Sequence, residues 1–160
     1  MLIALGDSHR HTGVLAGMAQ VLVREQPQVF VHTGDNYGDF LYLRRESKIP
    51  GHGVRGNCDP LLTLGAPEEV VFDYEGVKIF LTHGHKYGAK HSLDQLAARA
   101  RDLGAAAVIF GHSHVQLIEE RQGILFINPG SLSLPRGGSP AGYARLSAAG
   151  PKLSGQLVTI

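Results

Sequence analysis

The fold is decided by the stretch AAAVIFGHSH, which occupies residues 105–114. The apolar run that opens it is typical of a strand buried on both faces of a sheet. Gly111 ends this run, and His112 and His114 follow. In a continuing strand the two imidazoles would face the same way, whereas a turn at glycine lets each aim independently. The stretch therefore predicts a buried strand that carries two histidines to one sheet edge, where two nearby metal ions could take one each.

Two histidines this close are also compatible with an ordinary polar strand end, because imidazole is common both as a metal ligand and at surfaces. Three further apolar runs favour the metal interpretation, because each ends in similar chemistry. These are residues 2–6 before Asp7-Ser8-His9, residues 29–34 before Asp35-Asn36, and residues 77–82 before His83-Gly84-His85. Open α/β sheets bind ligands at the carboxyl ends of their strands. Four strand ends would thus bring Asp, Asn and His side chains into one crevice.

A fifth block, Gly56-Asn57-Cys58-Asp59, completes a recognisable series. In order, the blocks resemble the Asp-x-His, Gly-Asp, Gly-Asn-[His/Cys]-[Asp/Glu], Thr-His-Gly and Gly-His-x-His motifs of the calcineurin-like metallophosphoesterase superfamily. Within it the chain is similar to the small single-domain bacterial and archaeal phosphodiesterase group, which residues 128–131 and Pro135-Arg136 also resemble. The resemblance spans residues 7–136 and implies an α/β fold, a four-layer α-β-β-α sandwich of two mixed sheets with outer helices.

The candidate ligands suit divalent ions of intermediate hardness, such as Mn²⁺, Fe²⁺, Ni²⁺ or Zn²⁺, and argue against a Ca²⁺ cage of oxygens alone. The absence of paired thiolates argues against structural zinc. The resemblance implies two ions per chain, with Mn²⁺ preferred. It assigns Asp7, His9 and His114 to one ion, Asn57, His83 and His112 to the other, and Asp35 to both. Asp7 and Asp35 could instead be turn or cap residues after their strands.

Four residues are candidates for catalysis: Asn57, Cys58, Asp59 and His85. Many members of the superfamily have histidine where Cys58 stands, and there it resembles a general acid positioned by the acidic residue that follows. A thiol with a pKa near 8.5 can donate a proton but cannot become an imidazolium, so weaker protonation of the leaving group is expected. His85 could donate to the phosphate or support a metal ligand from behind.

Several other polar residues near the motifs receive structural interpretations. His32 lies on a predicted buried strand and is interpreted as a hydrogen-bonded structural histidine. Residues 128–131 are expected to form a rigid turn beside the site. Arg10 replaces the glycine usual after the first histidine, and it is either solvated or a phosphate clamp. The remaining candidates, interpreted as surface residues, are His11, His52 and His91.

The first half of the chain alternates strand and helix. Thr12 is the expected cap of a helix that ends at Pro27. A shorter helix is expected at 37–49, and Pro50 with the glycines after it should end this helix. Residues 51–56 match G-x-G-x-x-G, but no strand precedes them and no amphipathic helix follows, which argues against dinucleotide binding.

The second half is mostly strand. Ser92 and Gln95 match a capping box at the start of a helix, and Gly104 is the stop signal at its end. The expected strands are 69–74 paired with 77–82, 115–119 paired with 124–127, and 143–146 and 156–160. The glycine-rich residues 137–142 predict a mobile loop. Two packed mixed sheets with helices outside accommodate both halves.

Length and composition set further limits. The 160 residues fit one domain, 1–160, and a domain of this size buries roughly 70% of its unfolded surface. Lys and Arg number 15 against 14 Asp and Glu, so no overall field favours a nucleic-acid coat or a membrane surface. Cys58, the single cysteine, excludes an internal disulfide and suits a reducing compartment. With no leader or long apolar run recognisable, a cytoplasmic location is expected.

The favoured function is a metal-dependent phosphoesterase, and more specifically a phosphodiesterase in which a hydroxide held by two metal ions attacks phosphorus. The alternatives are a phosphomonoesterase and a non-catalytic protein-binding scaffold of the same fold. The expected partner is a small phosphodiester, with nucleic acid and membrane disfavoured. A homodimer or higher homo-oligomer is an expectation from the family resemblance alone.

Overall fold

The computed structural model describes residues 1–60 and 63–160. The first sheet and its helices comprise β1 (Leu2–Leu5), α1 (Thr12–Glu25), β2 (Val29–His32), α2 (Tyr37–Ser47), β3 (Gly51–Gly53), β9 (Gly142–Ala149) and β10 (Lys152–Thr159). The second sheet and its helices comprise β4 (Glu69–Tyr74), β5 (Val77–Thr82), η2 (His85–Tyr87), α3 (Asp94–Leu103), β6 (Ala107–Ile109), β7 (Leu117–Arg121) and β8 (Ile124–Asn128). The strand orders are β10-β9-β1-β2-β3 and β4-β5-β6-β8-β7.

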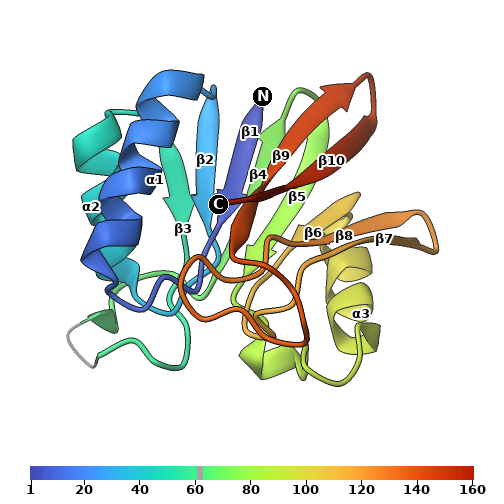
Figure 1. Ribbon diagram of the computed structural model, residues 1–160. Helices are drawn as coiled ribbons and strands as arrows, with labels where there is room; N and C mark the ends of the chain where they lie inside the picture. The colour runs from blue at the N-terminus through green and yellow to red at the C-terminus, as the bar shows by residue number, and fades with distance from the viewer. Residues whose placement is uncertain (61–62) are drawn as a thin grey trace.

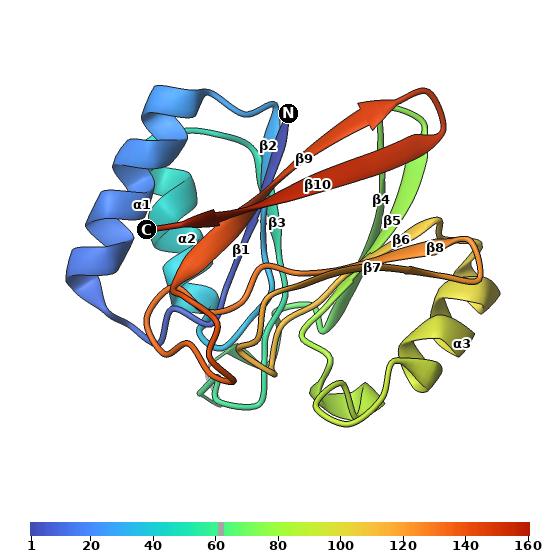
Figure 2. The ribbon, with the colours of Figure 1, turned by 45° about the vertical axis from the view of Figure 1, so that its right-hand side comes forward.

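The two sheets pack against each other, and helices cover their outer faces, with α1 and α2 on one side and α3 on the other (Figure 1; Figure 2). Each strand of the first sheet alternates between these layers. In β1, Leu2 and Ala4 contact the core between the sheets, whereas Ile3 and Leu5 contact the helices. The predicted four-layer α-β-β-α sandwich of two mixed sheets is therefore confirmed.

The stretch at 105–114 lies in the middle of the second sheet, where β6 pairs with β5 and β8 in parallel. Ala107 and Ile109 face the first sheet, and Val108 and Phe110 face α3. Both faces of the strand are thus buried, as its unbroken apolar sequence predicts.

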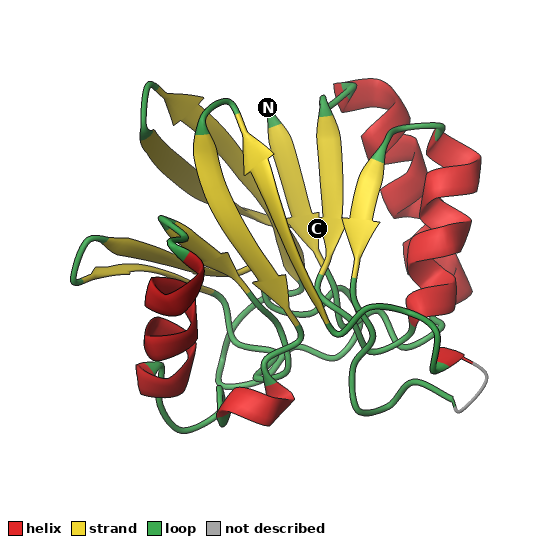
Figure 3. Ribbon diagram, turned by 180° about the vertical axis from the view of Figure 1, so that it is seen from behind, coloured by secondary structure: helices red, strands yellow, loops and turns green. Residues whose placement is uncertain are grey.

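The parallel strands bring their carboxyl ends to the same end of the molecule. In the first sheet β1, β2 and β3 are parallel, and in the second β5, β6 and β8 are parallel. Figure 3 shows from behind how the loops gather beyond the strand ends. A side-chain Cβ at Gly111 would lie 2.6 Å from Asp7 Oδ2, so glycine is required where the loop after β6 meets the loop after β1. The candidate residues from both sheets consequently share one region.

The predicted cap of the first helix is wrong by one residue. His11 occupies the N-cap position, where its Nδ1 accepts a hydrogen bond from Val14 N at 3.4 Å, and Thr12 is already helical. Histidine can replace the usual hydroxyl here because its unprotonated ring nitrogen also accepts a hydrogen bond. At the other end Gln26 adopts a left-handed conformation just before Pro27, which agrees with the predicted stop.

The capping box predicted for the third helix does not form. Ser92 Oγ accepts a hydrogen bond from Asp94 N at 3.0 Å, but Leu93 is the N-cap residue and makes no side-chain cap. The serine closes a local turn one residue before the helix begins, so the spacing to Gln95 no longer fits the motif. Gly104 ends the helix in a left-handed conformation, as predicted.

The helix ends before Pro50, as predicted, since α2 stops at Ser47. The strand that follows was not predicted: Gly51–Gly53 forms the edge strand β3, parallel to β2. The glycines are needed for close packing: a Cβ at Gly53 would lie 2.5 Å from Phe40 Cγ. The hairpin at 69–74 and 77–82 has the predicted bounds. The expected helix at 37–49 and the second hairpin are present with shifts at their ends, and β9 and β10 are longer than expected. The two strands pair with each other throughout, and such cross-strand pairing extends a ribbon beyond its apolar segment.

His52 is not the surface residue that was predicted. It is half-buried, and its ring stacks on Phe72 with centroids 4.4 Å apart, which places β3 beside β4 across the two sheets. Edge strands that lie next to each other can cover one another's side chains. None of the described helices combines the length and apolar composition that crossing a membrane would require.

Candidate metal centre and its surroundings

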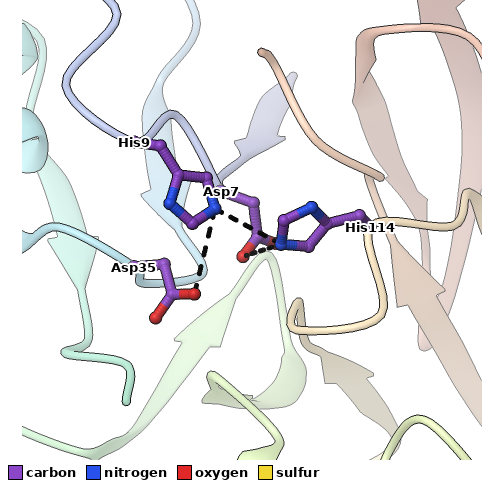
Figure 4. Close-up of side chains that lie close together, drawn as sticks. All are labelled: Asp7, His9, Asp35 and His114. Atoms are coloured by element: carbon purple, nitrogen blue, oxygen red, sulfur yellow. Dashed lines mark hydrogen bonds and ion pairs between the residues drawn. The ribbon is translucent and has the colours of Figure 1, made fainter. Parts of the chain in front are cut away.

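Four of the predicted ligands form one compact group. The ligand atoms of Asp7, His9, Asp35 and His114 all lie within 4.8 Å of one another (Figure 4). His114 Nε2 is 3.4 Å from Asp7 Oδ1 and 3.3 Å from His9 Nε2, and His9 Nε2 is 3.9 Å from Asp35 Oδ2. Asp7 and His9 follow β1, Asp35 follows β2, and His114 follows β6. Both sheets therefore contribute to this group.

A divalent cation fits the donor atoms of this group. Asp7 is fully buried, and its Oδ1 has no hydrogen-bond partner among the described residues. A buried carboxylate oxygen without a donor is costly unless a cation compensates it. The mixture of carboxylate oxygen and imidazole nitrogen matches metals of intermediate hardness. The group could thus hold a metal ion, as the sequence predicted for these four residues.

The other predicted ligands lie on the opposite side of Asp35. His83 Nε2 is 3.2 Å from Asp35 Oδ1 and also 3.2 Å from Asn57 Oδ1. The ring of His112 lies 5.0 Å from the ring of His83, centroid to centroid. Asp35 therefore presents Oδ1 to this second group and Oδ2 to His9 in the first. Its two oxygens have the arrangement that a bridging carboxylate needs, although the role itself stays a prediction.

Two of the histidines are fixed by hydrogen bonds to carbonyl oxygens. His83 Nδ1 donates to Thr33 O at 2.9 Å, and His114 Nδ1 donates to Leu134 O at 2.7 Å. A carbonyl only accepts, so the proton lies on Nδ1 and the lone pair lies on Nε2. Partners of this kind commonly orient metal-ligating histidines. In both residues Nε2 points into the centre, beside other predicted ligands.

The local charges favour a neutral His112 and an ionised Asp35. Burial, with the nearby charges of His83 and Lys90, lowers the pKa of His112 to about 4. Burial alone would raise the pKa of Asp35, but His83 and the Cys58 amide outweigh it and the pKa is lowered. For His114 the effect of burial is outweighed by Asp7, which raises the pKa of this imidazole. The two histidines after β6 therefore lie in different electrostatic surroundings.

The loops that carry these residues contain a concentration of unusual backbone. The non-glycine residues with left-handed φ include Asp7 at 48°, His9 at 47°, Asp35 at 52°, His112 at 69° and His114 at 60°. Each such residue costs of order 1 kcal/mol and persists only where surrounding structure holds it. All five are predicted metal ligands. Clustering of strain at one place is typical of a functional site.

Cys58 and Asp59 lie at the edge of the second group. The Cys58 thiol is exposed, and its amide donates to Asp35 Oδ1 at 3.0 Å. Burial of part of the residue, followed by its contact with Asp35, raises the pKa of the thiol to about 11. Asp59 accepts hydrogen bonds from the amides of Asn36, Tyr37 and Gly56 at 3.1, 2.6 and 2.7 Å. Its carboxylate thus ties the Asn57 turn to the start of α2, and its predicted part in catalysis stays a prediction.

His85 is half-buried and lies behind the second group, with its ring 5.3 Å from His83 and 6.1 Å from His112. Its Nδ1 is buried and has no hydrogen-bond partner among the residues that the structure describes. The residue is therefore near enough to contribute to the centre, and its assignment as a catalytic residue stays a prediction. Arg10 is exposed on the turn after His9, and its two interpretations stay predictions.

The turn at 128–131 has the structural role that was predicted. Asn128 Nδ2 donates to Gly111 O at 3.0 Å and to Ser113 Oγ at 2.9 Å. Ser131 Oγ donates to Asp7 O at 2.6 Å. The turn therefore fastens the loop after β6 and the loop after β1.

His32 is confirmed as a buried, hydrogen-bonded histidine. Its Nδ1 accepts from Gly34 N at 3.2 Å, and its Nε2 lies 3.0 Å from Ser8 Oγ. Burial lowers the pKa of His32 and outweighs the attraction of Asp39 and Asp7. The folded protein therefore binds a proton here less readily than the unfolded chain.

This depressed pKa gives a testable pH dependence. Stability from a neutral His32 is fully present above the unfolded pKa of about 6.5 and is lost as pH falls below it. Between pH 8 and pH 5.5 the free energy of unfolding should fall by up to about 1.4 kcal/mol from this residue. Urea unfolding with chelator present should show the loss in wild type and in the exposed-site control His91→Gln, and a smaller loss in His32→Asn. Equal pH dependence in all three proteins would contradict it.

One important residue escaped the sequence interpretation. Asp39 lies on α2 and is buried, although its place in the first turn of a helix suggested an ordinary solvated acid. It accepts hydrogen bonds from Ser8, Arg10 and Asn36. Its position four residues before Leu43 was the available signal, since this spacing puts both residues on the same face of α2.

The two groups also predict separate effects for the two histidines after β6. His114 contacts Asp7 and His9, whereas His112 lies beside His83. We expect His112→Ala and His114→Ala each to lose one bound ion and to retain the other. Metal content per chain, measured after loading with Mn²⁺ and removal of excess, tests this. Loss of both ions in both variants would contradict the division into two groups.

Comparison with known proteins agrees with this picture. Residues 1–150 match the calcineurin-like phosphoesterase superfamily domain. The chain is 34% identical over 148 residues to the probable metallophosphoesterase YsnB of Bacillus subtilis, covering 91% of this chain and 83% of YsnB. It is 37% identical over 100 residues to the phosphodiesterase YfcE of Escherichia coli, covering 58% of this chain and 50% of YfcE. The chain therefore belongs to the calcineurin-like phosphoesterase superfamily.

A solved structure extends the likeness to the whole fold. Vps29 of Entamoeba histolytica, in complex with Zn²⁺, is 26% identical and has a TM-score of 0.78 over 95% of this chain and 88% of Vps29. The family resemblance predicted from the five motifs is thus confirmed.

Proposed function

We propose that the protein is a phosphodiesterase that hydrolyses small phosphodiesters with two divalent ions, Mn²⁺ being the preferred metal. The observation that carries the proposal is the position of Asp35, whose two oxygens face two separate groups of nitrogen and oxygen donors. In this proposal Asp7, His9 and His114 hold one ion, Asn57, His83 and His112 hold the other, and Asp35 is shared. Two such ions stabilise charge on a phosphoryl group and make water acidic enough to serve as the nucleophile near neutral pH.

The chain's own residues supply geometry to this reaction. The carbonyls of Thr33 and Leu134 keep the imidazoles of His83 and His114 in one tautomer. Their metal-binding nitrogens therefore need no reorganisation when a substrate binds. His85 lies beside His83 and His112, and in this proposal it contributes to the binding of the phosphoryl group. The Cys58 thiol lies exposed beside Asp35 and stays neutral because its pKa is raised.

The distribution of charge supports a diester over a monoester. A monoester phosphate is a dianion near neutral pH and needs more positive charge than the diester monoanion. Arg55 and Lys86 flank Asn57 and His85 in sequence, and both form ion pairs with Glu68. Glu68 therefore compensates one of these two positive charges, which leaves less charge free for a dianion.

The test compares two substrates with one leaving group: bis(4-nitrophenyl) phosphate and 4-nitrophenyl phosphate. We expect the diester to be hydrolysed at least about tenfold faster in the presence of Mn²⁺, a difference of about 1.4 kcal/mol in barrier. Chelation should abolish both reactions. A faster monoester reaction would instead identify a phosphomonoesterase.

A non-catalytic binding protein is the second candidate, and the likeness to Vps29 is the observation that favours it. A non-catalytic protein would give a different result in the same assay. Wild-type protein shown to carry two ions per chain would then hydrolyse neither substrate above the rate of free Mn²⁺.

A further inference from the structure

His9 differs from His114, the other histidine of the first group, in how it is held. His114 has a carbonyl partner at its Nδ1, as does His83 in the second group. His9 makes its hydrogen bond through Nε2, and the described part of the chain offers no partner to its Nδ1. Its side chain is also partly exposed. The direction of this imidazole therefore depends on the backbone turn that carries it.

That turn is conformationally strained. His9 and Arg10 are adjacent and both left-handed, with φ of 47° and 59°, and Asp7 before them has φ of 48°. Non-glycine residues hold such conformations only when neighbouring contacts enforce them. Something outside the turn must therefore stabilise it.

Asp39 provides these contacts from α2. Its Oδ2 accepts hydrogen bonds from Ser8 Oγ at 2.7 Å and from Arg10 N at 2.9 Å, one on each side of His9. Its Oδ1 accepts from Asn36 Nδ2 at 2.9 Å. One buried carboxylate thus brackets His9 and joins its turn to the residue next to Asp35. Charge-assisted bonds of this kind are stronger than bonds between neutral groups.

The network continues inward with every proton assigned. Gly34 N donates to His32 Nδ1, which leaves the proton on Nε2. His32 Nε2 then donates to Ser8 Oγ, and the Ser8 hydroxyl donates to Asp39. Ser8 and His32 are fully buried, and Asp39 is nearly so. A fully satisfied buried network is rigid and specifies one arrangement.

We propose that Asp39, acting through Ser8 and the Arg10 amide, is the positioning residue for the ion held by Asp7, His9, Asp35 and His114. The inference rests on the proposed function only in taking these four residues as metal ligands. The turn that carries Asn57 is held separately, because the Asp59 carboxylate bonds Gly56 N at 2.7 Å. Asp39 therefore acts directly on the turn of the first ion and reaches the second ion only through Asn36 and the shared Asp35.

The test is Asp39→Asn, examined by calorimetric titration of chelator-treated protein with Mn²⁺. Either orientation of the amide turns its NH₂ group toward a donor, so part of the network is lost. Residues that orient metal ligands typically contribute about 10–100-fold to metal affinity. We expect one Mn²⁺ site to weaken by at least about tenfold and the other to stay within about twofold of wild type.

Ser47→Ala is the matched control for loss of a buried hydrogen bond. Ser47 is also buried on α2, and its Oγ donates to Leu43 O at 2.7 Å, but it touches no predicted ligand. Ser47→Ala should lower the melting temperature of metal-free protein while leaving both Mn²⁺ affinities unchanged. Ser8→Ala, which retains the carboxylate, should weaken the same site as Asp39→Asn and supplies the result if Asp39→Asn does not fold.

Two outcomes would overturn the inference. One is wild-type affinity at both sites in Asp39→Asn, or in Ser8→Ala if only that variant folds. The other is equal weakening of both sites. These failures are distinguishable from failure of the proposed function. A phosphodiesterase in which Asp39 has no positioning role binds two ions and turns over in every variant, whereas a protein that is not a metallophosphodiesterase fails with wild type.

Discussion

Replacing Asp35 with asparagine is expected to reduce diester hydrolysis by at least about 100-fold, since removal of one group that stabilises charge in a preorganised site typically costs about 10²–10³ in kcat. Oδ1 of this carboxylate lies 3.2 Å from His83 Nε2 and accepts the Cys58 amide at 3.0 Å. Oδ2 faces His9. An amide removes the negative charge between two dications and turns one of these acceptors into a donor. Fewer than two ions per chain should remain by metal analysis.

Asp73→Asn is the appropriate control, because Asp73 is an exposed carboxylate on β4. It removes the same charge from the protein and should change neither turnover nor metal content. If Asp35→Asn retained two ions and near wild-type activity, Asp35 would not be the shared ligand.

Replacing Cys58 with histidine should alter which leaving groups the enzyme tolerates. The thiol has its pKa raised to about 11, chiefly by burial, so it is a weak acid at neutral pH. Wild-type rates should then depend steeply on the pKa of the leaving group, with nitrophenyl diesters cleaved well and alkyl diesters poorly. An imidazole beside Asp59 would protonate the departing oxygen. General acids contribute about 10²–10⁴-fold, so alkyl diesters should gain about 100-fold or more and nitrophenyl diesters little.

The measurement is the rate of a series of diesters at saturating Mn²⁺ for wild type, Cys58→His and Cys58→Ala. The alanine variant should keep the wild-type slope, because the thiol contributes little proton transfer. An unchanged slope in Cys58→His, with both ions shown to be bound, would mean that this position does not control departure of the leaving group.

The sheets and the location of the site could be predicted because both depend on local patterns. The run at 105–110 is apolar on every residue, since β6 is covered by the first sheet on one face and by α3 on the other. Parallel strands bring their carboxyl ends together whatever the loops contain, so the polar residues after β1, β2, β5 and β6 were expected to meet.

The supports of the site could not be predicted, because they depend on contacts between distant segments. Asp39 bonds Ser8, which is 31 residues away in sequence. The helical period of α2 puts Asp39 on the same face as Leu43, but it does not show what a buried acid there would bond. β3 was missed for a related reason: Gly53 reads as a turn signal unless the Phe40 ring beneath it is known.

The two groups of ligands draw on both layers of the sandwich. Asp7, His9, Asp35 and Asn57 extend from the first sheet, whereas His83, His112 and His114 extend from the second. Ions bound between them would act as crosslinks at one end of the interface, and each would add about 2.7 kcal/mol of stability at a free concentration 100 times its Kd. Depletion of metal would therefore abolish the proposed activity. It would also allow the two sheets to separate at that end, where proteases could then cleave the chain. The lifetime of the protein in a cell would then depend on the free concentration of the metal there.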